Sequence, residues 1–295
     1  MTNVRLGILG LSEGNGHPYS WSAIINGYEP KAMAECPFPV IPQYLARQEF
    51  PRDALGGASV THVWADRQEE ARHIALAARI PNVVNHPQDM LGAVDAILLA
   101  RDDAENHLEM ARPFLVAGLP VYVDKPVAQT LRDLEAMLAL QQRPGQLFSC
   151  SALRWAREFD LTPYRDEIGP VRHIQATTPK SWTKYAVHVI DPILEQLGLF
   201  GVPAEVIRVA EAPAVVHIRW PHCTATVTCT GALPSDVRLR VFGESGVRDL
   251  IFSDSFTAFR DALRRFVESV RDEGHGTPPE ELRAMVRILE CGMGS

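Results

Sequence analysis

A glycine-rich turn follows the first apolar run of the sequence. The run Val4–Leu9 leads into Gly10–Gly16, and a segment with the composition of a helix, Ser20–Ile25, comes next. A strand, a glycine-rich turn and a helix in this order place free backbone N–H groups at the positive end of a helix, which suits a pyrophosphate. The spacing departs from Gly-x-Gly-x-x-Gly, because Ser12 stands where the second glycine would be. A tight strand-to-helix turn without a ligand is therefore the alternative.

An acidic residue, Asp66, follows the next apolar run, Ser59–Trp64. A carboxylate at the end of a second strand accepts hydrogen bonds from the ribose hydroxyls of an adenosine. Asp66 lies about 50 residues after the turn instead of about 20, and the segment Tyr28–Ala58 accounts for the surplus. Asp66 would repel a 2′-phosphate and so favours NAD, whereas Arg67 could attract one and leaves NADP open. The N-cap of a helix is the alternative role of Asp66.

The elements that must position these residues alternate between strands and helices over residues 1–150. Further predicted strands and helices are Gln68–Ala78 (helix), Asn82–Val84 (strand), Pro87–Leu91 (helix), Val94–Ala100 (strand), Ala104–Val116 (helix), Val121–Val123 (strand) and Thr130–Leu140 (helix). This alternation predicts an α/β domain with a parallel, doubly wound sheet. The segment Tyr28–Ala58 contains five prolines and cannot be one regular element, so we interpret it as an insertion.

The character of the sequence changes over residues 151–295. The predicted strands here are Val171–Thr178, Val206–Ala210, Ala214–Trp220, Cys223–Thr230 and Val237–Phe242, and the predicted helices are Val187–Leu197, Ala258–Arg271 and Pro279–Glu290. Strands that follow one another through short turns predict a mostly antiparallel, open sheet. We therefore expect a second, α+β domain.

Composition excludes several classes of protein. The chain has 295 residues, of which 46% are hydrophobic and 22% charged, so intrinsic disorder is excluded as the main state. A net charge of −7 and a pI of about 5.8 disfavour nucleic acids and anionic membranes as partners. The apolar run Pro113–Val123 is too short to cross a bilayer. The N-terminus has no signal-peptide cleavage site, so we expect a cytoplasmic protein.

The five cysteines are scattered and predict reduced, structural thiols. They are Cys36, Cys150, Cys223, Cys229 and Cys291, without a Cys-x-x-Cys pair. His217, His222 and Cys223 come nearest to a metal-binding pattern, but adjacent residues of a strand point to opposite faces. We therefore expect no metal site.

Several motifs carry a resemblance to one protein family. Asp124-Lys125-Pro126 resembles the Glu-Lys-Pro signature of the glucose-fructose oxidoreductase/inositol dehydrogenase (Gfo/Idh/MocA) family, with Asp in place of Glu. Asp102–His107 occupies the place of its Thr-Pro-x-x-x-His helix start, and Leu153-Arg154-Trp155 resembles its Tyr-Arg-Phe strand. Phe256–Glu290 is similar to its closing helices. The resemblance covers nearly the whole chain outside the insertion.

The resemblance implies an N-terminal Rossmann domain, a second domain whose sheet forms homodimers or homotetramers, and hydride transfer between a nicotinamide and a sugar or cyclitol carbon. It also implies that Lys125 is catalytic and that its bond to Pro126 is cis. A solvated lysine at a strand end is the alternative. The predicted cofactor-binding residues are Gly10, Leu11, Ser12, Gly14, Asp66, Arg67, Arg101, His107, Asp124 and Lys125, and Arg154 is a predicted substrate-binding residue.

The stretch Lys184–Asp191 matches a family helix that begins Asp-x-x-x-His-x-x-Asp. Spacings of four and three would put Lys184, His188 and Asp191 on one helix face. His188 is then the candidate general acid/base and Asp191 a substrate-hydroxyl acceptor. Lys184 replaces the family's catalytic Asp, and it either binds an anionic group of the substrate or acts as a neutral base, unless the chemistry has been lost.

Two alternatives to a sugar or cyclitol dehydrogenase stay open at this point: nicotinamide-assisted elimination or hydrolysis on a sugar, and a non-catalytic dinucleotide sensor. We expect the insertion to cover the substrate. Its Tyr28, Phe38 and Tyr44 either offer stacking faces to a sugar ring or pack onto the first domain.

Overall fold

The computed structural model describes residues 3–271 and 276–294, which form two compact units. Unit 1 comprises the described residues of Met1–Val127, Glu135–Ser149 and Phe259–Pro278. Unit 2 comprises those of Ala128–Leu134, Cys150–Ala258 and Pro279–Ser295. Helices α6 (Leu131–Ala139) and α10 (Ser255–Arg271) contribute residues to both units.

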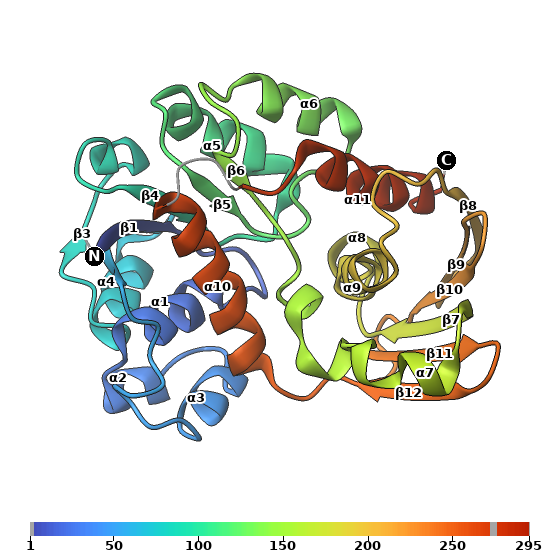
Figure 1. Cartoon of the computed structure of the whole chain (residues 1–295). Helices are drawn as coiled ribbons and strands as arrows, with labels where there is room; N and C mark the ends of the chain where they lie inside the picture. The colour runs from blue at the N-terminus through green and yellow to red at the C-terminus, as the bar shows by residue number, and fades with distance from the viewer. Residues whose placement is uncertain (1–2, 272–275, 295) are drawn as a thin grey trace. The chain divides into compact units, whose positions relative to one another are not determined.

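Unit 1 is built on a parallel sheet (Figure 1). Its strands are β1 (Val4–Leu9), β2 (Ala58–Trp64), β3 (Asn82–Val83), β4 (Ala96–Leu99), β5 (Val121–Val123) and β6 (Leu147–Phe148). They lie in the order β3-β2-β1-β4-β5-β6, and each neighbouring pair runs parallel. This is the order of a Rossmann sheet, in which ligands bind where the order reverses, between β1 and β4. The predicted fold class is confirmed.

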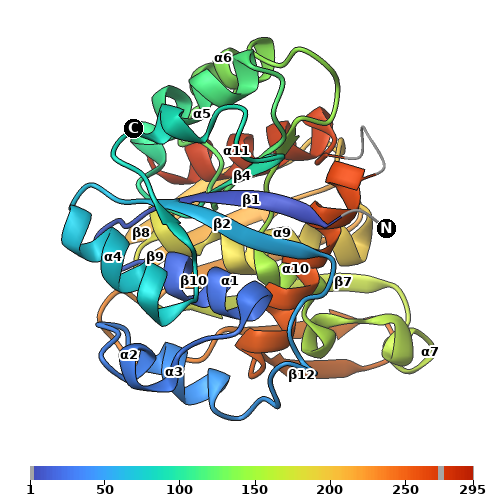
Figure 2. The ribbon, with the colours of Figure 1, turned by 90° about the vertical axis from the view of Figure 1, so that its left-hand side faces the viewer.

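Helices cover both faces of this sheet. Helices α1 (His17–Asn26) and α4 (Gln68–Ala77) lie on one face, and α5 (His107–Val116) lies on the other (Figure 2). Two predicted helices begin or consist of 3₁₀ turns, namely η1 (Pro87–Met90) and η2 (Ala104–Asn106). Trp21 of α1 stacks on Tyr122 of β5 with ring centroids 4.8 Å apart, which fastens α1 to the sheet.

The insertion forms two short helices, α2 (Pro30–Ala34) and α3 (Val40–Leu45), that pack on unit 1. The Tyr44 hydroxyl donates a hydrogen bond to Ser20 Oγ on α1, and the Phe38 ring lies 6.4 Å from that of Tyr19. Tyr28 meets Phe50 edge to face at 5.2 Å. The structure therefore shows Tyr44 and Phe38 packing onto α1, and Tyr28 packing within the insertion. A covering role of the insertion stays a prediction.

Unit 2 contains a mixed sheet that is mostly antiparallel. Its strands are β7 (Val171–Thr178), β8 (Glu205–Glu211), β9 (Ala214–Arg219), β10 (Thr224–Cys229), β11 (Arg238–Gly243) and β12 (Val247–Ile251), in the order β12-β11-β7-β10-β9-β8. Neighbours pair antiparallel except β7 and β10, which run parallel. Ile174 and Ala176 of β7 are buried while Gln175 between them is exposed, so one face of the sheet is covered.

Helices α8 (Trp182–Tyr185), α9 (Val187–Leu197) and α11 (Pro279–Gly292) lie against the covered face (Figure 1). Helix α7 (Arg165–Ile168) precedes the sheet. The segment before it winds through the 3₁₀ turns η3 (Ala152–Trp155), η4 (Arg157–Phe159) and η5 (Thr162–Tyr164). The strand expected at Leu153-Arg154-Trp155 was therefore wrong. The Ser151 hydroxyl accepts the Leu153 N–H at 3.2 Å and so begins a helical turn there instead.

No described helix combines the length and the apolar composition that crossing a bilayer requires.

Candidate functional site

The glycine-rich turn leaves β1 at the point where the strand order reverses. A Cβ atom on Gly10 would lie 2.1 Å from Cγ of Pro18, so only glycine fits where the turn meets α1. Gly14 has a φ of 78° and open space around its Cβ position. The turn is therefore open on the side of Gly14, where a ligand can approach the backbone.

Ser12 explains the departure from the usual glycine pattern. Its hydroxyl donates to Asp102 Oδ1 at 2.9 Å and accepts the Asp102 N–H at 3.1 Å, and both side chains are buried. Asp102 follows β4, so these hydrogen bonds tie the turn to the neighbouring strand across the reversal of strand order. A glycine at this position could not make either bond.

The start of α1 differs from the expectation of free amide groups. The His17 N–H donates to Asn15 Oδ1 at 2.8 Å, Pro18 has no N–H, and the Tyr19 N–H donates to Gly16 O at 3.1 Å. The sequence order alone could not show this, because the Asn15 side chain caps the helix from within the turn. The amides of the first helical turn are therefore already used.

Asp66 lies past the end of β2 and keeps 57% of its side chain exposed. Arg101, which is buried, donates from Nη1 to Asp66 Oδ2 at 2.6 Å and from Nε and Nη2 to both oxygens of Asp103 at 2.9 and 2.7 Å. Burial alone would lower the pKa of Arg101, but these hydrogen bonds raise it above its ordinary value. Arg101 thus holds Asp66 in place from inside the protein.

Two other predicted cofactor residues lie differently. His107 is fully buried, and its ring nitrogens face the carbonyl oxygens of Val127 at 3.1 Å and Arg101 at 2.9 Å. It therefore supports the loops after β4 and β5 from the interior. Arg67 is 67% exposed, with Nε 3.4 Å from Glu70.

A buried cluster surrounds the predicted catalytic lysine at the end of β5. Lys125 is buried, its bond to Pro126 is cis as expected, and its N–H donates to Asp124 Oδ1 at 2.8 Å. Asp124 Oδ2 accepts from Asn15 Nδ2 at 2.8 Å and His17 Nδ1 at 2.7 Å. Burial alone would raise the pKa of Asp124, but the charges of His17 and Lys125 outweigh it and lower that pKa.

Sequence reasoning missed Asn15 and His17 as members of this cluster. Their signal is a pair of polar side chains at the last positions of the glycine-rich turn and the first of the helix. Such residues lie near the carboxyl ends of the strands in a doubly wound sheet. The pattern places them near a ligand, but only the fold brings them to Asp124.

Unit 2 gathers His188, Asp191 and one residue that the sequence did not single out, Ser151. The Ser151 hydroxyl is 2.9 Å from His188 Nδ1, and the Ser151 N–H donates to Asp191 Oδ2 at 2.6 Å. All three side chains are buried, and the Tyr185 ring meets His188 edge to face at 5.0 Å. This network holds the imidazole through Nδ1.

Arg154 and Asp191 form an ion pair in the interior of unit 2. Arg154 Nε lies 3.2 Å from both Asp191 Oδ1 and Glu195 Oε2, and Nη2 donates to Glu281 Oε2 at 2.6 Å. The guanidinium also lies 4.3 Å from the Phe200 ring centroid. Both residues were predicted to bind substrate; the structure shows them paired with each other, and their contact with a substrate stays a prediction. Asp191 accepts the hydrogen bond of the Ser151 N–H, and the Ser151 hydroxyl in turn contacts His188.

Lys184 lies on α8 and not on the helix that carries His188 and Asp191. Helix α8 ends at Tyr185, Ala186 separates the two helices, and α9 begins at Val187. The single helix over Lys184–Asp191 that the spacing predicted was therefore wrong. In α8, the N–H groups of Tyr185 and Ala186 donate to the carbonyl oxygens of Ser181 and Trp182. In α9, the N–H groups of Val189 and Ile190 both donate to the carbonyl oxygen of Ala186.

Asp191 makes the stability of the fold depend on pH. Burial raises the pKa of its carboxyl to about 6, while Arg154 and the Ser151 N–H act in the opposite direction. Because the folded pKa lies above the ordinary value of 3.8, the stabilisation by the bound proton is complete below about pH 4 and disappears as pH rises through 6. The shift of two pKa units corresponds to about 3 kcal/mol.

We therefore expect the unfolding free energy of Asp191→Asn, relative to the parent, to rise between pH 4 and pH 7. Urea unfolding at several pH values measures this difference. Asp249→Asn removes an exposed carboxylate on the edge strand β12 and is the matched control, which should not reproduce this rise. A pH-independent difference for Asp191→Asn would contradict the raised pKa.

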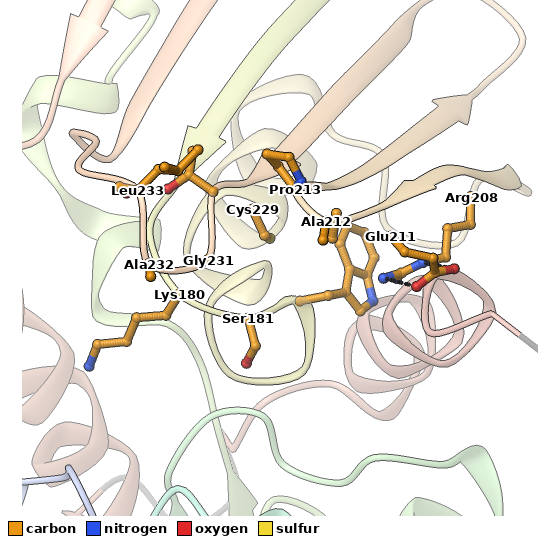
Figure 3. Close-up of a pocket in the computed structure, with 13 residues that line it drawn as sticks. Lys180, Ser181, Arg208, Glu211, Ala212, Pro213, Cys229, Gly231, Ala232 and Leu233 are labelled. Carbon is orange, nitrogen blue, oxygen red and sulfur yellow. Dashed lines mark hydrogen bonds and ion pairs between the residues drawn. The ribbon is translucent and has the colours of Figure 1, made fainter.

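A cavity of about 420 Å³ lies elsewhere in unit 2 (Figure 3). It is lined by the β8–β9 turn at Ala212 and Pro213, the end of β10 at Cys229, and the segment before α8 at Lys180 and Ser181. The ion pair between Arg208 and Glu211 closes one end. None of the predicted catalytic residues lines this cavity. Within residues 3–271 and 276–294, no three His, Cys, Asp or Glu side chains form a metal-binding group.

Comparison with known proteins finds similar sequences and similar structures. Residues 43–151 match the sequence model of the Gfo/Idh/MocA oxidoreductase family, described as having an NAD-binding Rossmann fold. This match relates the first part of the chain to that family. The matched residues include strands β2 to β6 of the Rossmann sheet. They also include Asp66, Arg101, His107 and Lys125. A segment of 84 residues is 32% identical to YceM of Salmonella typhimurium, and it covers 28% of this chain and 27% of that protein.

Solved structures share the fold of nearly the whole chain. Myo-inositol 2-dehydrogenase from Lactobacillus plantarum has a TM-score of 0.72 at 16% identity, covering 99% of this chain and 96% of that one. UDP-N-acetylglucosamine 3-dehydrogenase from Acidithiobacillus ferrooxidans has a TM-score of 0.68 at 15% identity, also covering 99% and 96%. At such identities the similarity establishes the fold.

Proposed function

We propose that this protein is an NAD-dependent oxidoreductase that transfers a hydride between the nicotinamide and a hydroxyl or keto carbon of a sugar, cyclitol or related compound. The observation that carries the proposal is the family's Rossmann sheet with Lys125 buried at the end of β5 and the Asp66 carboxylate exposed past β2. The dehydrogenases named above, which have the same fold, act on compounds of this class.

The residues of unit 1 fit a bound dinucleotide. Open space at Gly14 lets a diphosphate approach the turn, and Arg101 holds Asp66 where a ribose acceptor is needed. When bound, NAD supplies the hydride acceptor of the reaction. The turn that would contact the cofactor consists of Gly10, Leu11, Ser12 and Gly14.

The side chains of the protein handle the proton and the charge. Lys125 polarises the carbinol oxygen of the substrate, and His188, oriented by Ser151, exchanges the proton of that hydroxyl. Asp191 accepts the Ser151 N–H and pairs with Arg154, and binding of substrate hydroxyls by these two residues stays a prediction. Lys184 binds an anionic group of the substrate. The negative charge of that group offsets the electrostatic cost of a second lysine ammonium group in the proposed site.

The environment of Asp66 predicts a preference for NAD. A 2′-phosphate would face the Asp66 carboxylate, and Arg67 already lies near Glu70, which offsets its charge. We expect NADH to bind at least tenfold more tightly than NADPH, as measured by cofactor fluorescence. Asp66→Ala should reduce this ratio to near one, because the repulsion is removed.

Arg67→Ala is the matched control and should leave the ratio unchanged. Thermal unfolding of Asp66→Ala shows whether the loss of the Arg101 ion pair has affected the fold. Tighter binding of NADPH than of NADH by the parent would mean that Arg67, and not Asp66, selects the cofactor.

We also propose a cytoplasmic homodimer or homotetramer that associates through the sheet of unit 2. Its face opposite α9 carries partly exposed side chains, and Ile207 and Val209 of β8 are more than half exposed. Light scattering of the purified protein gives the assembly size, and a monomer would contradict this proposal.

A further inference from the structure

The diphosphate of a dinucleotide needs positive charge or hydrogen-bond donors, and the start of α1 supplies few of them. Between Gly10 and Pro18 the sequence holds one acidic side chain, Glu13, and one that can carry a positive charge, His17. The amides of His17 and Tyr19 are used within the turn, and Pro18 has none. The helix start alone therefore does not account for phosphate binding.

The neighbouring cation at the switch point of the sheet is also engaged. Arg101 makes hydrogen bonds with Asp66 and Asp103, so its charge is balanced by two carboxylates. Asp102 and Asp124 add further acidic groups after β4 and β5. A diphosphate that enters here needs a cationic side chain of the turn itself.

The candidate for this cationic side chain is His17. Its Nδ1 is held by the Asp124 carboxylate at 2.7 Å, its ring stacks on Trp21 at 5.0 Å, and the edge of Phe259 meets it at 5.0 Å. The His17 side chain keeps 16% of its surface exposed, whereas that of Asp124 keeps 1%. The ring is therefore fixed in orientation, and Nε2 is the nitrogen that Asp124 does not use.

We propose that the imidazolium of His17 binds the diphosphate of the dinucleotide through Nε2, while Asp124 holds the ring through Nδ1. This inference rests on the proposed NAD-dependent function. In this arrangement Nε2 provides a charge-assisted hydrogen bond to the phosphate. Asn15, which donates to the same oxygen of Asp124, keeps the carboxylate facing the turn.

The test compares ligands with and without a diphosphate. His17→Asn keeps a donor for Asp124 but carries no charge, and His17→Phe keeps the aromatic packing on Trp21 but has no donor. We expect both variants to bind NADH and ADP-ribose about tenfold or more weakly than the parent, because a charge-assisted hydrogen bond is lost. Their affinity for adenosine, which has no phosphate, should stay within about twofold.

His73→Asn is the matched control, since His73 makes a hydrogen bond with Tyr19 at 2.7 Å on the same unit. It should bind all three ligands as the parent does. Unchanged NADH and ADP-ribose affinity in His17→Asn, or an equal loss for adenosine, would overturn the role of His17. Failure of the parent to bind NADH would instead contradict the proposed function. Thermal unfolding confirms that each variant is folded.

Discussion

Replacing Lys125 by methionine should lower turnover about a hundredfold or more while the affinity for NADH changes little. Lys125 is buried at the end of β5, and its backbone N–H donates to Asp124, which fixes the backbone at this position. A cation at the carbinol oxygen stabilises the charge that develops there, and loss of a placed acid or base costs two to four orders of magnitude. Methionine keeps the length of the side chain and removes the charge.

Lys31→Met is the control for this experiment, because Lys31 lies on the exposed surface of α2. Turnover and the dissociation constant of NADH are measured separately for both variants. Near-parent turnover in Lys125→Met would remove this lysine from the mechanism. A matching loss of NADH affinity would mean that Lys125 serves mainly to bind the cofactor.

The second large effect is expected for His188→Ala, which should also lose about a hundredfold or more in turnover. The imidazole is the group of unit 2 suited to exchange a proton near neutral pH, and Ser151 holds its Nδ1. Ser151→Ala should lose less, about tenfold, and should alter the pH profile of turnover, because the ring remains but is no longer oriented.

His173→Asn on β7 is the matched control, since His173 makes a hydrogen bond with Thr224 Oγ1 at 2.7 Å and is not a predicted site residue. It should behave as the parent does. If His188→Ala retains turnover, the proton leaves by another route. If Ser151→Ala matches the parent at every pH, Ser151 does not orient the imidazole.

Elements with strong local patterns were predicted with their bounds. Strands β1 (Val4–Leu9) and β5 (Val121–Val123) and helix α9 (Val187–Leu197) have the expected limits. Strand β5 is a short apolar run, β1 is apolar except for Arg5, and α9 is bounded by a C-terminal glycine. The sequence of each of these segments is therefore sufficient to predict the element that it forms.

Other elements lack such a pattern. Strand β12 (Val247–Ile251) lies at a sheet edge, where its apolar residues Val247 and Ile251 are more than two fifths exposed, so no buried run marks it. The break between α8 and α9 falls at Ala186, whose φ and ψ of −55° and −34° are helical. Neither a glycine nor a proline stands at this break, and the spacing therefore predicted one helix.

The partners in the candidate site depend on topology. His17 reaches Asp124 across 107 positions, and Ser151 reaches His188 across 37. The glycine-rich turn and the motif around Lys125 indicate the cofactor and the lysine, but they do not indicate which side chains orient them. The parallel sheet, which brings the ends of β1 and β5 together, establishes the first pair, and the packing of η3 on α9 in unit 2 establishes the second.

Transfer of deuterium from a labelled substrate to the cofactor tests the central claim most directly. The protein is incubated with NAD⁺ and a panel of cyclitols, sugars and sugar acids that carry deuterium on carbon, and the cofactor is then analysed by mass spectrometry. Our account predicts that at least one member of the panel yields reduced cofactor with one deuterium. Tight binding of NAD⁺ without any labelled cofactor across the whole panel would contradict it.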